Sequence, residues 1–185
     1  MTRCSPPPDI RRAMLDAAHA LLDEGGMSAL GLRAITRRAG VSATSGDPYF
    51  GNHAGVLAAL AAEGYDALAE ALERAGADAR ARGMAYLRFA LARPAMFELM
   101  FRSDRLDRSN PALRAASERA FAALGMLAAE GSEHERALRA TAAWGAVHGL
   151  ATLAVDGRLE RLREMADAPD LLTLVSEALG MWRLG

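Results

Sequence analysis

The sequence predicts an all-α protein, and three observations lead to this conclusion. Of the 185 residues, 51% are hydrophobic, which is enough to form a buried core. Ala and Leu are abundant, β-branched residues are scarce and only 5% of residues are aromatic, a composition that favours helices over strands. Apolar residues also recur at helical spacing along most of the chain. We therefore expect about nine helices that cover almost all of it.

The N-terminal third has the pattern of consecutive helices. Apolar residues recur at helical spacing over residues 9–24, and Gly25 and Gly26 end the pattern, so a first helix is predicted there. A shorter helix is predicted over residues 32–39. A longer one over residues 53–75 then connects this region to the rest of the chain.

A glycine corner follows the second predicted helix. Gly40 can adopt the left-handed conformation of a tight turn, and the apolar residues Ile35 and Val41 are expected to hold the flanking helices together. Helix, short helix, glycine turn and another short element is the order of a helix-turn-helix. The same pattern also fits two packed helices joined by a glycine corner, without any role in binding.

Capping residues predict further helices in the C-terminal part. The expected ranges are 83–94, 94–101, 110–131, 132–155 and 171–182. Asn110 is a good N-cap, and Ser132 with Glu135 forms the pattern of a capping box. The charged segments 103–110 and 156–169 are predicted to be exposed loops.

Composition argues against several classes of protein. Cys4 is the only cysteine, so an intramolecular disulfide is excluded, and we expect no metal site, no cofactor and a reducing compartment. Nothing at the N-terminus resembles a signal peptide. The longest uncharged run, residues 140–155, is too short and too polar for a membrane span. A cytoplasmic protein with no membrane partner is expected.

Known catalytic motifs are missing from the sequence, and we expect no enzyme. It contains no His-Glu-x-x-His, no Gly-x-Ser-x-Gly, no phosphate-binding loop and no Lys for a Schiff base. A site assembled in space around His148 stays open as the enzymatic alternative.

The net charge is −1, but the first 45 residues carry six Arg against four acidic residues, a weak electrostatic indication of nucleic acid at that end. The absence of Lys fits the base composition of a gene as well as phosphate contacts.

Several motifs together resemble those of one family. AITRRAGVS at residues 34–42, followed eight residues later by Phe50 and a new helix, resembles the DNA-binding region of the TetR family. This part of the resemblance covers residues 9–60. YLRFALARPAMFELMF at residues 86–101 and WGAVHG at residues 144–149 resemble the ligand domain of a branch of that family marked by a Trp-His-Gly pattern.

The resemblance implies a helix-turn-helix DNA-binding domain in residues 1–60 and a ligand-binding and dimerisation domain in residues 61–185. The last two long helices would form a four-helix bundle in a homodimer, over a pseudo-palindromic double-stranded DNA operator with half-sites about 34–36 Å apart. A small apolar molecule among the C-terminal helices would release a repressor from that operator. The candidate DNA-binding residues are Arg33, Arg37, Ser42, Ala43, Thr44, Ser45, Tyr49 and His53.

A second group of side chains is predicted to line an apolar cavity with one polar group, as in many small-molecule sites. The candidates are Phe89, Met96, Phe97, Met100, Phe101, Met126, Trp144 and His148. Each Met or Phe also fits an ordinary core position, and His148 also fits a hydrogen-bonded core histidine. The small residues Ala142, Gly145, Gly149 and Thr152 form a strip that predicts close helix packing, within the chain or across a dimer.

The recognition segment departs from the family pattern. Residues 42–53 read SATSGDPYFGNH, so with Phe50 in register, Gly46, Asp47 and Pro48 fall in the middle of the recognition helix. Pro costs a helix interior roughly 3 kcal/mol and Gly about 1 kcal/mol, so a broken or shortened helix is predicted. A helix that restarts with Asp47 as N-cap and merges toward the next one is an alternative packing.

Two further departures lie at positions that contact phosphate in the family. Gly31 replaces the usual Ser or Thr cap, and His53 replaces the usual Lys. A neutral imidazole offers less attraction to phosphate than an ammonium group. The alternative to a ligand-responsive repressor is therefore a dimeric TetR-like ligand-binding protein with weak or no operator binding.

Overall fold

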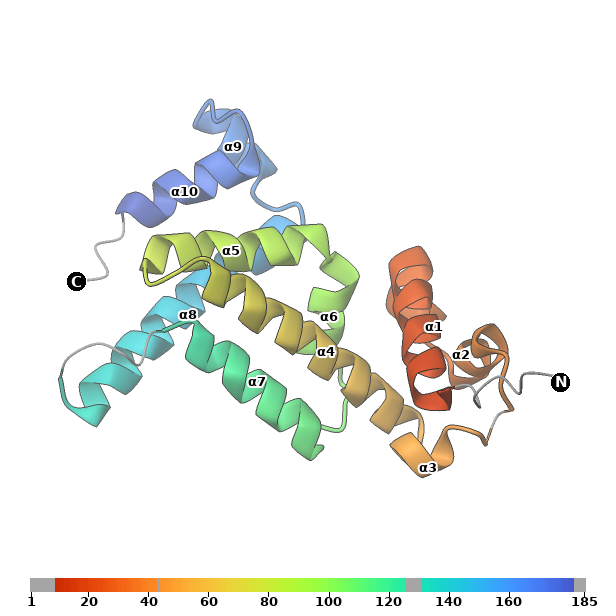
Figure 1. Ribbon diagram of the computed structural model, residues 1–185. Helices are drawn as coiled ribbons and strands as arrows, with labels where there is room; N and C mark the ends of the chain where they lie inside the picture. Colours follow the sequence, from red (N-terminus) through yellow and green to blue (C-terminus); the bar gives the residue numbers. More distant parts are fainter. Residues whose placement is uncertain (1–8, 43, 126–130, 182–185) are drawn as a thin grey trace, which may run out of the picture.

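The computed structural model describes residues 9–42, 44–125 and 131–181 (Figure 1). Within these ranges the protein has ten α-helices, one short 3-10 helix and no strand, which confirms the all-helical prediction. The elements are α1 (Ile10–Gly25), η1 (Gly26–Ala29), α2 (Leu32–Ala39), α3 (Asp47–Phe50), α4 (His53–Arg74), α5 (Ala79–Ala92), α6 (Pro94–Arg102), α7 (Pro111–Ala123), α8 (Glu133–Val155), α9 (Glu160–Met165) and α10 (Leu171–Met181).

The predicted caps are present at the starts of the long helices. The Asn110 side chain accepts hydrogen bonds from two backbone N–H groups at the start of α7. Ser132 and Glu135 form the reciprocal capping box of α8. Gly40 ends α2 in the left-handed conformation, with φ 70°. These local signals mark the starts of α7 and α8 and the end of α2 as expected, whereas α5 begins at Ala79 instead of residue 83 and α7 ends at Ala123 instead of residue 131.

One helix was not anticipated. The segment 156–169, expected to be a loop, contains the six-residue helix α9. Leu159 at its start is 3% exposed, and the Arg163 Nε atom lies 2.7 Å from Glu160 Oε2 one turn away. One buried leucine and an ion pair therefore accompany a helix too short to show a periodic pattern in the sequence.

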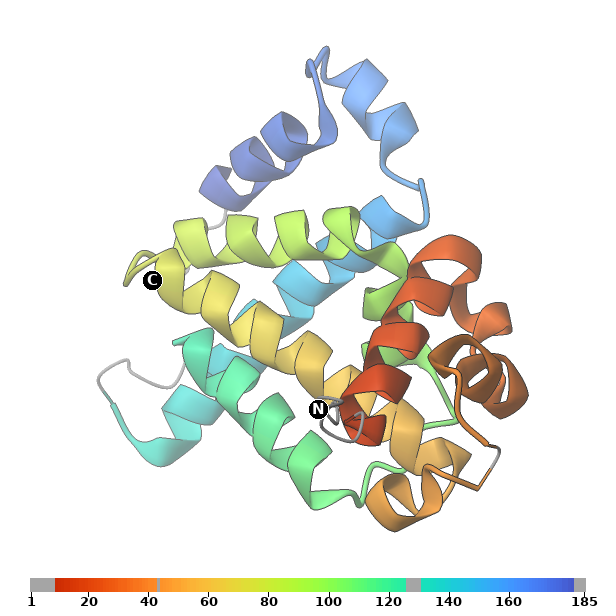
Figure 2. The ribbon, with the colours of Figure 1, turned by 45° about the vertical axis from the view of Figure 1, so that its right-hand side comes forward.

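Helix α4 lies in the middle of the molecule. Figures 1 and 2 show it between α5 on one side and α7 on the other, and it also contacts α1, α3 and α6. Twelve of its 22 residues are buried. At the N-terminal end, α1 and α3 pack on α4 and α2 packs on α1, whereas α8 and α10 reach α4 through α5.

Two glycines allow α4 to approach its neighbours closely. A Cβ atom built at Gly55 would lie 1.9 Å from the backbone oxygen of Phe50, at the end of α3. A Cβ atom at Gly64 would lie 2.6 Å from the Met96 sulfur of α6. Backbone cannot move aside as a flexible thioether can. The contact at Gly55 therefore tolerates an added side chain less well than the contact at Gly64. No helix in the described ranges is long and apolar enough to cross a membrane.

We expect Gly55→Ala to destabilise the protein by roughly 1–3 kcal/mol, because the added methyl group must push the Phe50 carbonyl away. Gly64→Ala is the matched control on the same helix, and it should cost less because Met96 can adjust. Urea unfolding of both variants at one protein concentration measures the difference in the free energy of unfolding. An equal or larger cost for Gly64→Ala would contradict this ranking.

Candidate functional site

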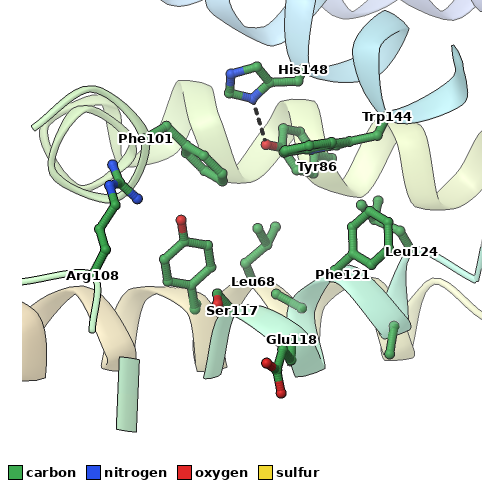
Figure 3. A pocket seen from close by; sticks show the side chains of 13 residues that line it. Leu68, Tyr86, Phe101, Arg108, Ser117, Glu118, Phe121, Leu124, Trp144 and His148 are labelled. Carbon is green, nitrogen blue, oxygen red and sulfur yellow. Dashed lines mark hydrogen bonds between the residues drawn. The ribbon is translucent and has the colours of Figure 1, made fainter. Parts of the chain in front are cut away.

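A cavity of about 720 Å³ lies between α4, α5, α6, α7 and α8 (Figure 3). This volume falls in the range of about 300–1,000 Å³ that small-molecule sites occupy. The wall is formed by Tyr65, Leu68, Tyr86, Phe101, Arg108, Ser117, Glu118, Ala120, Phe121, Ala122, Leu124, Trp144 and His148. Side chains from five different helices and the loop after α6 thus converge on one space.

A neutral polar pair stands in the wall. Tyr86 on α5 and His148 on α8 are joined by a hydrogen bond of 2.9 Å between the phenol oxygen and the imidazole Nδ1 (Figure 3). Burial raises the pKa of Tyr86, which is 1% exposed. Burial, together with the positive charge of Arg102, lowers the pKa of His148. Both groups are therefore uncharged at pH 7 and act as hydrogen-bonding groups in an apolar wall.

Aromatic rings form most of the remaining wall. The Phe101 ring lies 4.8 Å from the His148 ring and 5.4 Å from the Tyr65 ring, measured between centroids. At the other end, Phe121 and Trp144 meet edge to face at 5.8 Å. Trp144 and His148 are one turn apart on α8, so both reach the cavity. The cavity is thus suited to flat, apolar molecules.

The structure brings together some of the predicted ligand-binding residues and separates others. Phe101, Trp144 and His148 line the cavity. The other described candidates do not: Met96, Phe97 and Met100 are at most 1% exposed in the core, and Phe89 lines a second hollow together with α4 residues such as Ala67 and Ala71. Met126 lies outside the described residues.

Other lining residues were missed in the sequence. Tyr65 and Tyr86 are buried tyrosines on α4 and α5, and Phe121 is on α7. A buried tyrosine needs a hydrogen-bond partner for its hydroxyl group, so a tyrosine at an apolar position of a predicted helix was the sequence feature that could have pointed to these residues. Tyr65 finds it in the backbone oxygen of Met100, at 3.0 Å. Which face of each helix meets the cavity follows only from the packing.

The recognition helix is short, as predicted. Helix α3 consists of four residues, with Pro48 in its first turn, and the residues before it form turns. The cap is Gly46 rather than Asp47, because Gly46 is buried against Met14, where a Cβ atom would lie 2.7 Å from Met14 Cε. Gly51, with φ 71°, then separates α3 from α4. The predicted merger with the next helix is therefore wrong.

Most candidate DNA-binding side chains are at the surface. Arg33, Arg37, Ser42 and Thr44 are exposed, and Tyr49 is 51% exposed. Ser45 is half-buried, with its Oγ atom 2.7 Å from that of Ser42. Ala43 lies outside the described residues.

His53 is the exception among these candidates. Its Nε2 lies 2.6 Å from the backbone oxygen of Leu30, so the imidazole contacts the residue at the end of η1 instead of facing outward.

The loop between α6 and α7 connects the cavity wall to the N-terminal unit, which consists of α1, η1, α2 and α3. Arg105, in the loop between α6 and α7, donates hydrogen bonds to the backbone oxygens of Met27, at 3.0 Å, and Leu30, at 3.1 Å. The Leu30 oxygen is the same one that His53 approaches. Arg108, three residues further along this loop, lines the cavity. One short segment therefore touches both the cavity and the end of η1.

Solved structures share the fold of this chain. A structure of a protein with unknown function from Rhodococcus sp. RHA1 is 26% identical, with a TM-score of 0.69, over 96% of each chain. The regulatory protein SCO4313 is 22% identical, with a TM-score of 0.69, over 94% of this chain and 96% of that one. The transcriptional regulator SCO7222, a TetR from Streptomyces coelicolor, is 21% identical, with a TM-score of 0.53, over 82% of this chain and 72% of that one. The last two show a shared fold alone.

Family models match both parts of the chain. No curated protein sequence matches it. Residues 14–60 match the model described as bacterial regulatory proteins, tetR family. Residues 79–179, more than half of the chain, match the tetracyclin repressor-like C-terminal domain. The chain therefore belongs to the TetR family of DNA-binding transcriptional regulators, which are not enzymes.

Proposed function

We propose that this regulator is a cytoplasmic repressor that leaves its operator when a small apolar molecule binds in the cavity between α4 and α8. The observation that carries the proposal is the cavity itself, with its aromatic wall and one neutral polar pair. Trp144 and His148 belong to the Trp-His-Gly pattern, and both line it. We therefore assign the C-terminal part to the branch with that pattern, and place the division between residues 1–60 and 61–185 within α4.

The loop between α6 and α7 supports a link between ligand and DNA. Arg108 would contact a molecule in the cavity, and Arg105 holds the end of η1 through two backbone oxygens. A ligand that moves this loop would therefore shift the helix-turn-helix unit relative to α4. Because such coupling is reciprocal, operator binding would weaken ligand binding by the same factor.

A surface on α8 and α10 supports a homodimer. Leu138, Leu153 and Met181 are 58%, 38% and 84% exposed, unusual values for large apolar side chains on helices. A Cβ atom at Gly145 or Gly149 would meet nothing within 4 Å, so these two glycines of the strip border open space. This favours packing of this surface against a second copy of the chain. The helix-turn-helix units of the two subunits would then bind the two halves of a pseudo-palindromic operator.

A second candidate function is that of a ligand-binding dimer with weak or no operator binding. Its support is α3, whose four residues present little of the surface that a continuous recognition helix would offer. Asp47 is exposed there and would repel phosphates. His53 lies against the backbone oxygen of Leu30 and does not face outward. The two candidates differ in whether specific DNA binding is measurable.

Fluorescence anisotropy with DNA from the gene's own upstream region, at about 50 mM salt, decides between them. Specific binding, displaced by unlabelled upstream DNA and not by unrelated DNA, is expected for the repressor. Binding that does not depend on sequence favours the second candidate.

We expect Arg37→Gln to weaken DNA binding and to reduce the slope of log affinity against log salt by roughly 0.9 for each phosphate contact, or about 1.8 for a dimer. Arg37 is exposed at the end of α2. Arg38→Gln is the matched control, because Arg38 already binds both oxygens of Glu24 at 2.6 Å. Anisotropy titrations over a salt series measure both slopes. Equal slopes for the two variants would show that Arg37 makes no phosphate contact.

We expect Gly145→Glu to convert the dimer into a monomer, because a charged side chain would enter the interface while meeting open space within its own chain. Light scattering coupled to size-exclusion chromatography measures the mass. Gly31→Glu is the control, since a Cβ atom there also meets nothing within 4 Å but lies far along the chain, before α2. A dimeric Gly145→Glu variant would place the interface elsewhere.

A further inference from the structure

The cavity wall carries one cation whose hydrogen-bonding capacity is largely unused. Arg108 Nη2 makes a hydrogen bond of 3.5 Å to the backbone oxygen of Ser103, which is at the long limit for such a bond. Within the described ranges, none of the ion pairs includes Arg108. A guanidinium group has five N–H donors in a planar fork that matches a carboxylate. Most of these donors are left for another partner.

The guanidinium of Arg108 stands beside the aromatic part of the wall. Figure 3 shows the Arg108 side chain at the same end of the cavity as Phe101. Burial raises the pKa of Tyr65, and the nearby Arg108 acts against this increase. The positive charge therefore lies close to the phenol of Tyr65, where a ligand between the rings would meet it.

Glu118, the one acidic residue among the described residues of the wall, makes no ion pair with Arg108. Glu118 is exposed on α7, and its Oε1 atom lies 3.8 Å from Arg114 one turn earlier on the same helix. Figure 3 shows its carboxylate directed away from Tyr86 and Trp144. Tyr86 and His148 carry no charge at pH 7. Among the described residues of the wall, Arg108 is therefore the charged group beside the rings.

The shape of the wall selects for a planar ring system. Tyr86, Phe101, Phe121 and Trp144 come from four different helices and present rings around the same space. Planar aromatic molecules make offset and edge contacts with such rings, whereas bulky saturated ones cannot make these contacts. The rings thus surround the space, and the positive charge of Arg108 lies at the end formed by Phe101 and Tyr65.

We propose that the ligand class of this cavity is planar aromatic anions: an apolar ring system between Phe101, Phe121 and Trp144 with one carboxylate or similar group at Arg108. This inference rests on the proposed function, because it names the class of molecule that the sensing cavity takes. The apolar body accounts for most of the contact area, and the anionic group fixes the orientation through a two-point contact with the guanidinium.

Two probes of nearly identical shape test the charge requirement. 2-Naphthoate carries a carboxylate, and 2-naphthamide replaces it with a neutral amide. Trp182→Phe leaves Trp144 as the remaining one of the two tryptophans, so fluorescence reports on the cavity wall. We expect 2-naphthoate to bind roughly tenfold or more tightly than 2-naphthamide, because hydrogen bonds to charged groups are stronger than neutral ones.

Variants of Arg108 identify the group responsible. Arg108→Gln should lower the affinity for 2-naphthoate roughly tenfold and leave that for 2-naphthamide within about twofold. Arg114→Gln is the matched control, since Arg114 is an exposed arginine that pairs with Glu118 on the outside of α7. Arg108→Met, which keeps the aliphatic part of the side chain, should behave like Arg108→Gln. Thermal unfolding establishes that each variant is folded.

The outcomes separate this inference from the proposed function. Equal binding of the two probes, or an Arg108→Gln variant that binds 2-naphthoate as the parent does, overturns the anionic class while Trp144 still reports a ligand in the cavity. If neither probe changes the fluorescence of Trp144 at millimolar concentration, both the ligand class and the sensing role of the cavity are overturned. Selective loss of 2-naphthoate binding in both Arg108 variants supports the inference.

Discussion

The close packing around α4 is the constraint on which the rest of the structure depends. The helix is buried along most of its length, and it contacts α1, α3, α5, α6 and α7. Gly55 brings the backbone of α3 against it, and Gly64 brings the side chains of α6 against it. Tyr65, next to Gly64, then projects into the cavity wall. The position of α3 and the shape of the cavity therefore both depend on residues of one helix.

Helix α8 combines two surfaces with different chemistry. His148 and Trp144 face the cavity, whereas Gly145 and Gly149 border open space. Trp144 takes part in both, since it lines the cavity and is still 39% exposed. A molecule that reorients this indole would thus alter the surface that we assign to the dimer.

Much of this fold was predictable from the sequence, because its signals are local. Caps such as Asn110 and Ser132 act within one helical turn, and the break caused by Gly46 and Pro48 follows from backbone chemistry alone. The cavity was predictable only in part. Met96 and Trp144 are both apolar residues at helical spacing, and which of them faces a cavity depends on how helices distant in sequence pack. The role of Arg105 has no local signal at all, since its partners lie 75 and 78 residues away.

The Leu30 carbonyl has a consequence for how the two parts of the chain hold together. Its oxygen accepts from Arg105 of the C-terminal part and lies 2.6 Å from the ring of His53 at the start of α4, so three segments meet at one atom. A carbonyl oxygen has two lone pairs, and both are engaged here. Separating the helix-turn-helix unit would break both of these contacts with the Leu30 oxygen, which belongs to a fully buried residue. The regions matched by the two family models are therefore tied together at one backbone atom.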